Sequence, residues 1–495
     1  MAKDRVIVIG AGMGGLSAAL LLAARGLDVT LLERAAAPGG KMRLVQDGGF
    51  GIDAGPTVFT LKRVFEEIFA GAGLDFDAHV HVKRGTILAR HAWGRGARFD
   101  LHADIDQSAN EIARFFNPRE AAGFRAFCTE SARIWRTVEG PVVRAERASL
   151  LGLILGAGVK GLPDLLATSP FESMWKALGR HFQDPRLRQL FGRYATYCGS
   201  SPFLSPATLM LIAHVEQDGV WMVDGGMHAL AQAFASAAQS KGAQIHYDAH
   251  VQKIMRAGKG FVVETAQGQV FQADKIIFNG DANALAQGFL GNDLRNAAPA
   301  VAPNKRSLSA LTCTMTARTK NFPLVRHNVF FSNDYPAEFA ALQSGSLDYD
   351  PTVYVCAQDR GDDDAPKDTP ERLLMLVNAP AFGDQKSLSD AEIDQCMMRM
   401  MARVEACGLQ IDKVPERRHI TTPQDFNRLF PATGGAIYGR PTHGWRATFT
   451  RPGVRSPIPN LYLTGGSVHP GAGIPMAALS GLTAAACLMQ DQTSR

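Results

Sequence analysis

The chain has 495 residues, of which 46% are hydrophobic and 20% are charged, and its formal net charge is +5. These values are typical of a globular protein with two or more domains, and they exclude a disordered chain. The small charge comes without a basic-aromatic platform or a recognised binding motif, so we expect no nucleic-acid partner. Seven scattered cysteines without a Cys-x-x-Cys pair argue against a disulfide framework and a zinc site, and we expect no metal.

The N-terminus and the hydropathy pattern bear on where the protein resides. Residues 1–5 lead directly into the first predicted strand, which leaves no room for a cleaved signal peptide. No apolar run reaches the roughly 18–20 residues that a spanning helix needs. We therefore expect a cytoplasmic protein that is soluble or peripherally attached to a membrane.

A strand, a glycine-rich turn and a helix open the chain. The β-branched residues 6–9 predict a buried parallel strand, and the apolar residues 16–24 predict a helix. Between them Gly10, Gly12 and Gly15 follow the G-x-G-x-x-G spacing. In such a turn the first glycine permits the sharp bend, the second lets the backbone approach a pyrophosphate, and the third lets the helix pack close to the strand. This pattern indicates a dinucleotide site.

A second strand and a second glycine-rich turn narrow the cofactor. Residues 29–32 predict a strand that ends at Glu33, an acid placed to bind a ribose hydroxyl. The segments Pro38-Gly39-Gly40-Lys41 and 51–57 follow. They resemble the extended fingerprint of FAD-binding amine-oxidase-type and carotenoid-desaturase-type flavoproteins, in which the second turn lies against the flavin side of the cofactor. Since NAD dehydrogenases do not need that turn, the resemblance implies FAD.

The middle of the chain differs from the N-terminal part in composition and predicted secondary structure. Residues 61–215 predict a helical region rich in Phe, Arg and Ala, and residues 133–193 carry ten basic and five acidic side chains. The apolar stretch 148–178, with flanking basic residues and a Trp, is typical of a segment in a membrane interface, although it could instead bury against the protein's own core. Residues 156–161 also fit G-x-G-x-x-G, but Pro163 would break the helix that should follow. We therefore expect no second nucleotide site and no site for NADPH.

The remaining segments predict how the domains are divided. We expect an α/β fold with a Rossmann-like FAD-binding domain of the amine-oxidase or glutathione-reductase type, an inserted α+β substrate domain, and a helical region that contacts a membrane. Alternating apolar residues predict an antiparallel sheet within 291–440, and the Met-rich helix 390–405 is interpreted as core or as the wall of an apolar cavity. The predicted FAD domain is discontinuous and comprises residues 1–60, 216–290 and 441–495.

The last motif identifies the resemblance more closely. A strand ends at Gly465-Gly466, and His469-Pro470-Gly471 and a small-residue helix, 477–488, follow. With the N-terminal motifs, this makes the chain similar over nearly its whole length to the bacterial carotenoid desaturase family, which includes phytoene desaturases. Within the family it resembles the 1-hydroxycarotenoid 3,4-desaturases of purple photosynthetic bacteria. One departure is Ala472, where many relatives have a glycine.

The resemblance implies a specific activity. It implies an FAD-dependent oxidoreductase that removes a hydride and a proton from adjacent carbons of a long polyene. The product would carry a new C-3,4 double bond in spheroidene-type carotenoid biosynthesis. The implied partners are an apolar carotenoid, either oxygen or a membrane quinone as electron acceptor, and the inner photosynthetic membrane as a peripheral docking surface.

The motifs and the resemblance together give a set of expected cofactor residues. Val251 matches the position whose backbone contacts the adenine in related flavoproteins, and Asn279 ends a strand beside the cofactor. The expected cofactor-binding residues are Gly10, Gly12, Met13, Gly14, Gly15, Glu33, Gly40, Lys41, Gly55, Pro56, Thr57, Val58, Val251, Asn279, Gly465, Gly466 and Met476. No catalytic residue is assigned; the side chains weighed as proton acceptors are His469, His214, Asp218 and Asp224.

Other functions remain open at this stage. A phytoene desaturase or a carotenoid isomerase of the same family differs only in substrate, which spacing and composition do not distinguish. An amine oxidase shares the N-terminal fingerprint, but the apolar insert argues against a small soluble amine. A prenyl-binding escort protein that has lost its flavin is disfavoured by the intact glycine motifs and Glu33.

Overall fold

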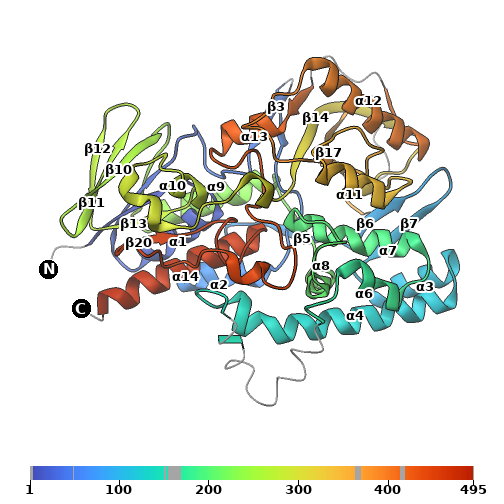
Figure 1. Cartoon of the computed structure of the whole chain (residues 1–495), viewed down its shortest axis with the longest axis horizontal. Helices are drawn as coiled ribbons and strands as arrows, with labels where there is room; N and C mark the ends of the chain where they lie inside the picture. The colour runs from blue at the N-terminus through green and yellow to red at the C-terminus, as the bar shows by residue number, and fades with distance from the viewer. Residues whose placement is uncertain are drawn as a thin grey trace.

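The computed structural model describes residues 4–47, 49–149, 152–153, 169–362, 369–412 and 418–493. Two sheets organise these residues: a five-stranded parallel sheet and an eight-stranded mixed sheet. In Figure 1 the parallel sheet lies on the left with both chain termini, the larger sheet lies at the upper right, and a helical layer runs beneath it.

The five-stranded sheet is assembled from three separate parts of the chain. Its order is β20-β13-β1-β2-β9, and every neighbouring pair is parallel. The β-branched stretch predicted at residues 6–9 is its central strand, buried on both faces, as helix-covered parallel sheets require. The strands are β1 (Arg5–Ile9), β2 (Asp28–Leu32), β9 (Gln244–His246), β13 (Lys275–Phe278) and β20 (Leu461–Leu463). The predicted Rossmann-like architecture is confirmed.

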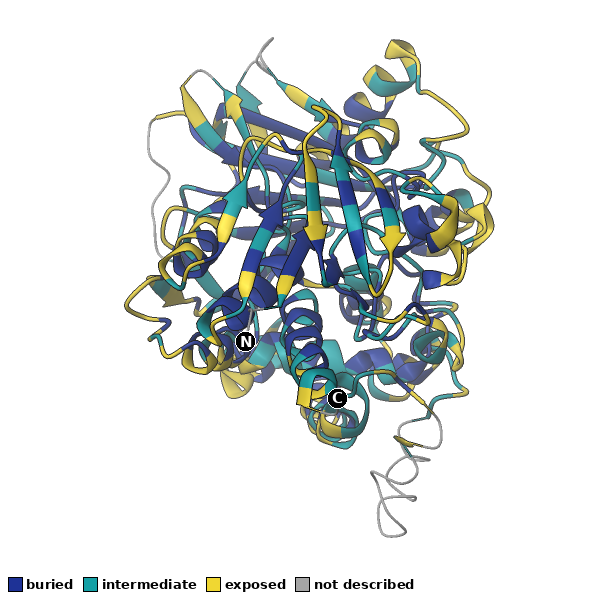
Figure 2. Ribbon diagram, turned by 90° about the vertical axis from the view of Figure 1, so that its left-hand side faces the viewer, coloured by how far each residue is buried: buried dark blue, intermediate teal, exposed yellow. Residues whose placement is uncertain are grey.

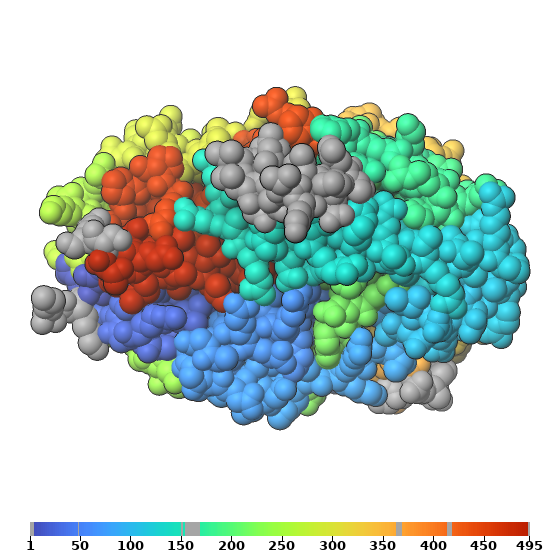
Figure 3. Space-filling view, turned by 90° about the horizontal axis from the view of Figure 1, so that it is seen from below, coloured from blue at the N-terminus to red at the C-terminus, as the bar shows by residue number. Residues whose placement is uncertain are grey.

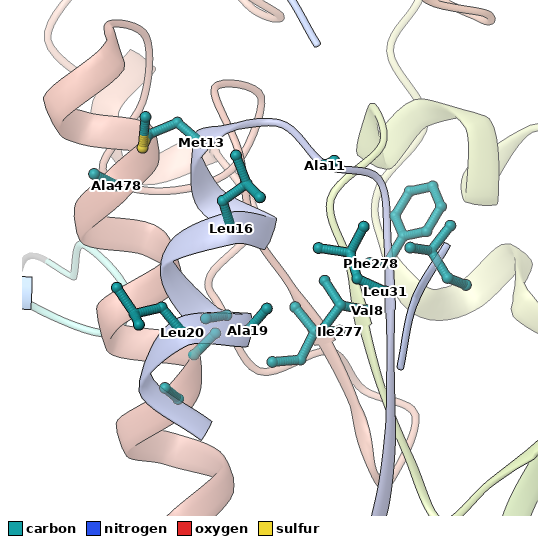
Figure 4. Close-up of a cluster of buried hydrophobic side chains, with 14 of the residues drawn as sticks. Val8, Ala11, Met13, Leu16, Ala19, Leu20, Leu31, Ile277, Phe278 and Ala478 are labelled. Carbon is teal, nitrogen blue, oxygen red and sulfur yellow. The ribbon is translucent and has the colours of Figure 1, made fainter. Parts of the chain in front are cut away.

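Helix α1 (Met13–Ala24) lies between this sheet and the C-terminal helix α14 (Ile474–Thr493), as Figure 4 shows. The side chains of Leu16 and Leu20 fill the space between the two helices and the strands. The helices approach closely because both carry glycine where they cross. A Cβ built on Gly481 would lie 2.1 Å from the carbonyl oxygen of Gly14.

A small antiparallel sheet packs beside the five-stranded parallel sheet. It consists of β10 (Val251–Ala257), β11 (Gly260–Thr265) and β12 (Val270–Ala273). Buried residues such as Val251, Ile254, Phe261 and Val263 pack towards the core, and most of the other residues of β10 and β11 are exposed or partly exposed (Figure 2). The 3-10 turn η4 (Asn292–Ala297) contacts β10 and α10 (Ala282–Ala286), whereas α9 (Met227–Ser240) packs against α1. The 3-10 turn η5 (Pro303–Lys305) follows η4 along the chain.

The larger sheet contains the alternating strands predicted within 291–440. Its order is β18-β14-β17-β16-β15-β6-β7, and β19 pairs with β14. The strands are β14 (Ser309–Lys320), β15 (His327–Phe330), β16 (Val353–Ala357), β17 (Glu371–Ala379), β18 (Gln410–Asp412) and β19 (His419–Thr421), joined by β6 (Ile87–Ala92) and β7 (Arg98–His102). Helices α11 (Tyr335–Gln343), α12 (Asp390–Ala406) and α13 (Pro423–Leu429) pack around it. Met397 and Met400 of α12 are buried in the sheet's core, so the Met-rich helix is a core helix.

The prediction that residues 61–215 are helical is wrong for part of the segment. Strand β5 (Val82–Arg84) pairs with β8 (Trp221–Val223), and β6 joins the larger sheet beside β15. Residues 87–102 form a hairpin around Gly94 and Gly96, and its first strand, β6, also pairs in parallel with β15. The helices of this segment are α2 (Lys62–Gly71), α3 (Ile105–Phe115), α4 (Pro118–Val138), α6 (Met174–His181), α7 (Pro185–Gly192) and α8 (Leu211–Asp218), with the short turns η1 (Glu139–Val143), η2 (Arg193–Cys198) and η3 (Ala207–Met210).

The helical layer meets the C-terminal part on the lower face of the molecule. Seen from below, the cyan and teal segment of α4 runs along this face and abuts the red C-terminal segment (Figure 3). Arg455 forms an ion pair with Glu146 at 3.0 Å across this junction. Most of the predicted membrane segment, and the glycine-rich stretch at 156–161, lie outside the described residues. Within the described ranges, no helix combines the length and apolarity needed to cross a bilayer.

Candidate cofactor and substrate site

The first glycine-rich turn has the geometry of a phosphate-binding loop. Gly10 has φ +99, and a Cβ on Gly15 would lie 2.2 Å from the carbonyl oxygen of Gly10. Helix α1 begins at Met13 and has no side-chain cap, so its first N–H groups are open to an anion. The roles predicted for Gly10 and Gly15 are thus visible in the backbone.

Asn279 connects the ends of three parallel strands beside this turn. Its Nδ2 donates to the carbonyl oxygen of Gly10 at 3.1 Å, and its Oδ1 accepts from the Thr464 hydroxyl at 3.0 Å. Cβ atoms on Gly12 and Gly14 would each approach the Asn279 amide to 2.8 Å. Asn279, predicted to bind the cofactor, therefore also holds the glycine turn against the strand that ends before Gly465.

Glu33 lies where the sequence places the ribose-binding acid. Its Oε2 accepts from the Ala11 N–H at 2.6 Å, and its Oε1 accepts from the Ala35 N–H at 2.8 Å. The N–H of Ala249 donates to the carbonyl oxygen of Glu33 at 2.8 Å, which brings the start of β10 at Val251 to the same end of the sheet. The predicted adenine-side residues are therefore neighbours.

The second glycine-rich turn lies directly on the first. The N–H of Gly39 donates to the carbonyl oxygen of Ala11 at 2.8 Å, and a Cβ on Gly40 would lie 3.2 Å from the Cα of Gly12. Lys41 follows, and its Nζ donates to the carbonyl oxygen of Ile437 at 2.6 Å. Burial lowers the pKa of Lys41 because the charged form loses its hydration.

The loop after the hairpin β3 (Leu44–Asp47) and β4 (Phe50–Asp53) forms the opposite wall. The Asp53 carboxylate accepts from the N–H groups of Met227 and His228 at 2.7 and 2.9 Å, which fixes the start of α9. A Cβ on Gly55 would lie only 1.8 Å from the carbonyl oxygen of Lys41. Residues 54–58 and the first turn of α14, including Met476, line one cavity. A flavin held against this loop would have the N-terminal end of the α14 dipole beside it, which favours the negative charge of a reduced flavin.

Taken together, these backbone contacts fit a dinucleotide that carries a flavin. Two glycine turns stack without side chains between them, an acid ends β2, and the second turn leads into a cavity. A pyrophosphate would lie at the uncapped start of α1, and a flavin ring would lie against Lys41, residues 54–58 and the start of α14.

The cavity continues from these loops to the surface and has a volume of about 730 Å³. It lies between the loops at Lys41, 54–58 and the start of α14, one face of the larger sheet, and the helices below that sheet. Most of the side chains around it are apolar; they include Val58, Leu61, Trp135, Val138, Val142, Leu209, Ile212, Val329, Leu374, Leu376 and Phe449. The alternating strands β14 to β17 therefore present one face to a cavity, as their sequence pattern predicts.

Polar side chains gather at one place in this apolar wall. Tyr197 donates to the Glu216 carboxylate at 2.7 Å, and Tyr194 donates to its other oxygen. The Arg193 guanidinium lies over both tyrosine rings, 5.1 Å from the centroid of Tyr197. The nearby Tyr354 hydroxyl is hydrogen-bonded to Thr57 Oγ1 and to His327, the first residue of β15.

That histidine, His327, is neutral. Its Nδ1 lies 2.7 Å from the Tyr354 hydroxyl. Burial, together with Arg326 and Arg193, lowers the pKa of His327 to about 3. The hydrogen-bonded chain from Thr57 to His327 therefore carries no charge of its own.

The side chains weighed as proton acceptors differ in position. His469 is buried and lines the cavity, whereas His214, Asp218 and Asp224 are not among the described lining residues. Nε2 of His469 donates to the carbonyl oxygen of Val142 at 2.7 Å, which leaves Nδ1 as a lone-pair acceptor with no partner in the described part of the chain. Burial lowers the pKa of His469 and keeps the ring neutral.

Known proteins are similar to this chain in sequence and in architecture. The family model of flavin-containing amine oxidoreductases matches residues 13–489. A hydroxyneurosporene desaturase of Rubrivivax gelatinosus is 53% identical over 99% of this chain and 94% of its own length, and one of Cereibacter sphaeroides is 42% identical over 99% and 98%. A 1-hydroxycarotenoid 3,4-desaturase of a Flavobacterium species is 30% identical over 96% and 97%. The chain belongs to the flavin-containing amine oxidoreductase family and, within it, to the carotenoid desaturases.

Solved structures agree on the fold. Wild-type putrescine oxidase bound to putrescine superposes with a TM-score of 0.60 at 14% identity, covering 100% of this chain and 99% of that one. A CLA-producing fatty acid isomerase from P. acnes gives a TM-score of 0.60 at 13% identity, covering 98% of each chain. At such identities the likeness concerns the architecture alone.

Sequence reasoning missed the polar side chains of the cavity. Arg193 and Tyr197 lie in η2, Glu216 in α8 and Tyr354 in β16, and none belongs to a glycine motif. The spacing of Arg193 and Tyr197 gives no local signal, because η2 is a 3-10 helix and residues four apart do not share a face there. Tyr354 has no local sequence signal either, because an alternating strand does not reveal which of its faces lines a cavity.

Proposed function

We propose that the protein is an FAD-dependent desaturase that introduces the C-3,4 double bond into 1-hydroxycarotenoids such as 1-hydroxyneurosporene, in spheroidene-type carotenoid biosynthesis. The observation that carries this proposal is the apolar cavity of about 730 Å³ that begins at the two predicted flavin loops and opens at the surface. The names of the relatives at 53% and 42% identity support the choice of substrate.

The side chains of the cavity suit this chemistry. Bound FAD supplies the hydride acceptor. The apolar walls, among them Leu374 and Leu376, exclude water and hold an extended polyene in one orientation, and such positioning contributes several kcal/mol to a rate. His469 Nδ1 offers a neutral acceptor for the proton that leaves the neighbouring carbon, since its Nε2–H is held by Val142.

The mouth of the cavity supports docking on a lipid surface. Phe171 and Trp445 both line the cavity, yet 72% and 40% of their surfaces are exposed, and their ring centroids are 5.5 Å apart. Exposed aromatic rings at the entrance of an apolar cavity suit insertion into a membrane interface. We place the protein on the cytoplasmic side of the inner photosynthetic membrane, attached peripherally, with oxygen or a membrane quinone as the electron acceptor.

The first experiment is a product assay. Purified protein with FAD and liposomes receives either 1-hydroxyneurosporene or phytoene, and the absorption spectrum of the product is recorded. We expect a red shift with the hydroxylated carotenoid, because one more conjugated double bond forms. Conversion of phytoene alone would support the phytoene desaturase alternative.

Two further results would contradict the whole proposal. Flavin bound without conversion of either carotenoid would favour an amine oxidase, and purified protein that binds a carotenoid but no flavin would favour the prenyl-binding escort.

Replacing Phe171 and Trp445 by serine tests the docking surface. We expect less protein to cosediment with liposomes and unchanged flavin absorbance, because both residues lie at the mouth.

A further inference from the structure

A cluster of polar side chains interrupts the apolar wall of the cavity where the wall meets the predicted flavin loop. We define the polar cluster as Thr57, Arg193, Tyr197, Glu216 and Tyr354. All five line the cavity, and they come from four separate parts of the chain. Packing a core does not require this arrangement, because burying polar groups is costly unless each is hydrogen-bonded.

The hydrogen bonds within the polar cluster leave capacity for a ligand. Arg193 and Glu216 are both buried, and Arg193 Nε has no partner among the described residues. Each Glu216 oxygen accepts one tyrosine hydroxyl, and a carboxylate oxygen has a second lone pair. A buried donor and a buried acceptor with spare capacity therefore stand together in the cavity wall.

A hydroxyl group matches this pair. An alcohol oxygen accepts one hydrogen bond and donates another, so a single hydroxyl can join the Arg193 guanidinium to the Glu216 carboxylate. Hydrogen bonds to charged groups are among the stronger ones in a buried site. A methyl group in the same place would leave both charged side chains without that partner.

The position of the polar cluster agrees with the chemistry of the substrate. Thr57 belongs to the loop that lines the predicted flavin site, and its Oγ1 lies 2.6 Å from the Tyr354 hydroxyl. In a 1-hydroxycarotenoid the hydroxyl-bearing carbon C1 is separated from C3 by C2 alone. A hydroxyl bound at the polar cluster would therefore hold the C-3,4 bond near that loop.

We propose that the polar cluster binds the tertiary hydroxyl at the end of the substrate, with Arg193 as donor and Glu216 as acceptor, while Tyr197 and Tyr354 hold these groups in place. This inference rests on the proposed function and adds the site that selects a hydroxylated end group. Tyr197 and Tyr354 are positioning residues in this scheme. The site places C3 and C4 beside the flavin and disfavours a carotenoid that lacks the hydroxyl.

The test compares two carotenoids in matched variants. The readout is the ratio of kcat/KM with 1-hydroxyneurosporene to kcat/KM with 1,2-dihydroneurosporene, which carries a hydrogen in place of the hydroxyl. We expect the wild-type ratio to be about 100 or more, because unpaired buried polar groups reject the analogue. In Glu216→Gln and Tyr197→Phe the ratio falls at least about tenfold, mainly through the hydroxylated substrate.

Tyr462→Phe is the matched control. Its hydroxyl also donates to a carboxylate, that of Asp491 at 2.6 Å, but in the cofactor part of the chain. We expect this variant to keep the wild-type ratio, so a general loss of stability cannot imitate the effect. An unchanged ratio in both Glu216→Gln and Tyr197→Phe overturns the inference while the proposed function stands.

A binding measurement separates the two proposals when no product forms. Trp135 and Trp445 line the cavity, so quenching of tryptophan fluorescence reports the Kd of each carotenoid. Tighter binding of 1-hydroxyneurosporene in the wild type, lost in Glu216→Gln, supports the polar cluster even when the reaction assay fails. Equal Kd values for the two carotenoids in the wild type overturn it.

Discussion

The cofactor sheet and the substrate sheet use different parts of the chain to build their share of the site. In the parallel sheet, backbone atoms form the predicted cofactor site: glycines let the two turns stack, and the N–H groups at the start of α1 have no side-chain cap. In the substrate sheet the backbone forms a regular ladder, and the site is made by side chains such as Tyr354 that project from one face.

This difference determines how each half tolerates change. A backbone site depends on the absence of side chains. Any atom added at a stacked glycine would clash with main-chain atoms that cannot move easily. A side-chain site depends on pairs of residues distant in the sequence, such as Thr57 and Tyr354, and each pair can be altered without moving the backbone. Binding of the cofactor should therefore be fragile to small additions, and substrate choice should be adjustable.

The largest effect is expected at Gly15. In Gly15→Ala the new Cβ would lie 2.2 Å from the carbonyl oxygen of Gly10, and neither backbone can yield easily. We expect a loss of about 3 kcal/mol in the free energy of unfolding, together with loss of bound flavin. Flavin absorbance of the purified variant and its thermal unfolding measure both effects.

Gly26→Ala is the matched control at the other end of α1. Gly26 has φ +81 and no atom within 4 Å of its built Cβ, so only backbone strain of about 1 kcal/mol is expected. Flavin should remain bound. Equal flavin loss in the two variants would contradict the idea that stacked backbone makes the cofactor site.

The same difference explains what could be predicted from the sequence. The stacked glycine turns, the position of Glu33 beside them and the assembly of the parallel sheet from three segments could be predicted, because a backbone site leaves a local pattern of small residues at fixed spacing. The polar cluster was not, because Thr57 and Tyr354 meet only after the larger sheet has formed. Strand β6 was missed although it forms a local hairpin with β7, because its other partner, β15, lies far along the chain.

A smaller effect is expected from a buried carboxyl in the substrate part. Glu338 in α11 accepts from the hydroxyls of Ser332 and Thr352 at 2.9 and 2.7 Å. Burial raises its pKa from 4.5 to about 7. Between these values the folded protein keeps a proton that the unfolded chain releases, so stability is greatest below pH 4.5 and declines as the pH rises towards 7.

Glu338→Gln removes this pH dependence. Between pH 4.5 and about 7, we expect the free energy of unfolding of the wild type to fall by about 2 kcal/mol relative to the variant. Denaturant unfolding at several pH values measures this difference. Gln retains an acceptor for Thr352, so the structure should persist. Parallel stability curves for the two proteins would show that Glu338 does not titrate in the folded state.

The smallest effect concerns α12, the Met-rich helix that could have lined the cavity. Ser389 caps it: its N–H donates to Glu392 Oε2 at 2.9 Å, and its hydroxyl accepts from the Glu392 N–H at 3.3 Å. Ser389→Ala should cost about 1 kcal/mol of stability, whereas Ser389→Asp, which keeps an acceptor, should cost less. Because Met397 and Met400 pack in the sheet's core, kcat/KM for a carotenoid should stay the same in both variants. A change in kcat/KM without a change in stability would mean that α12 reaches the cavity. It would contradict the assignment of α12 to the core of the larger sheet.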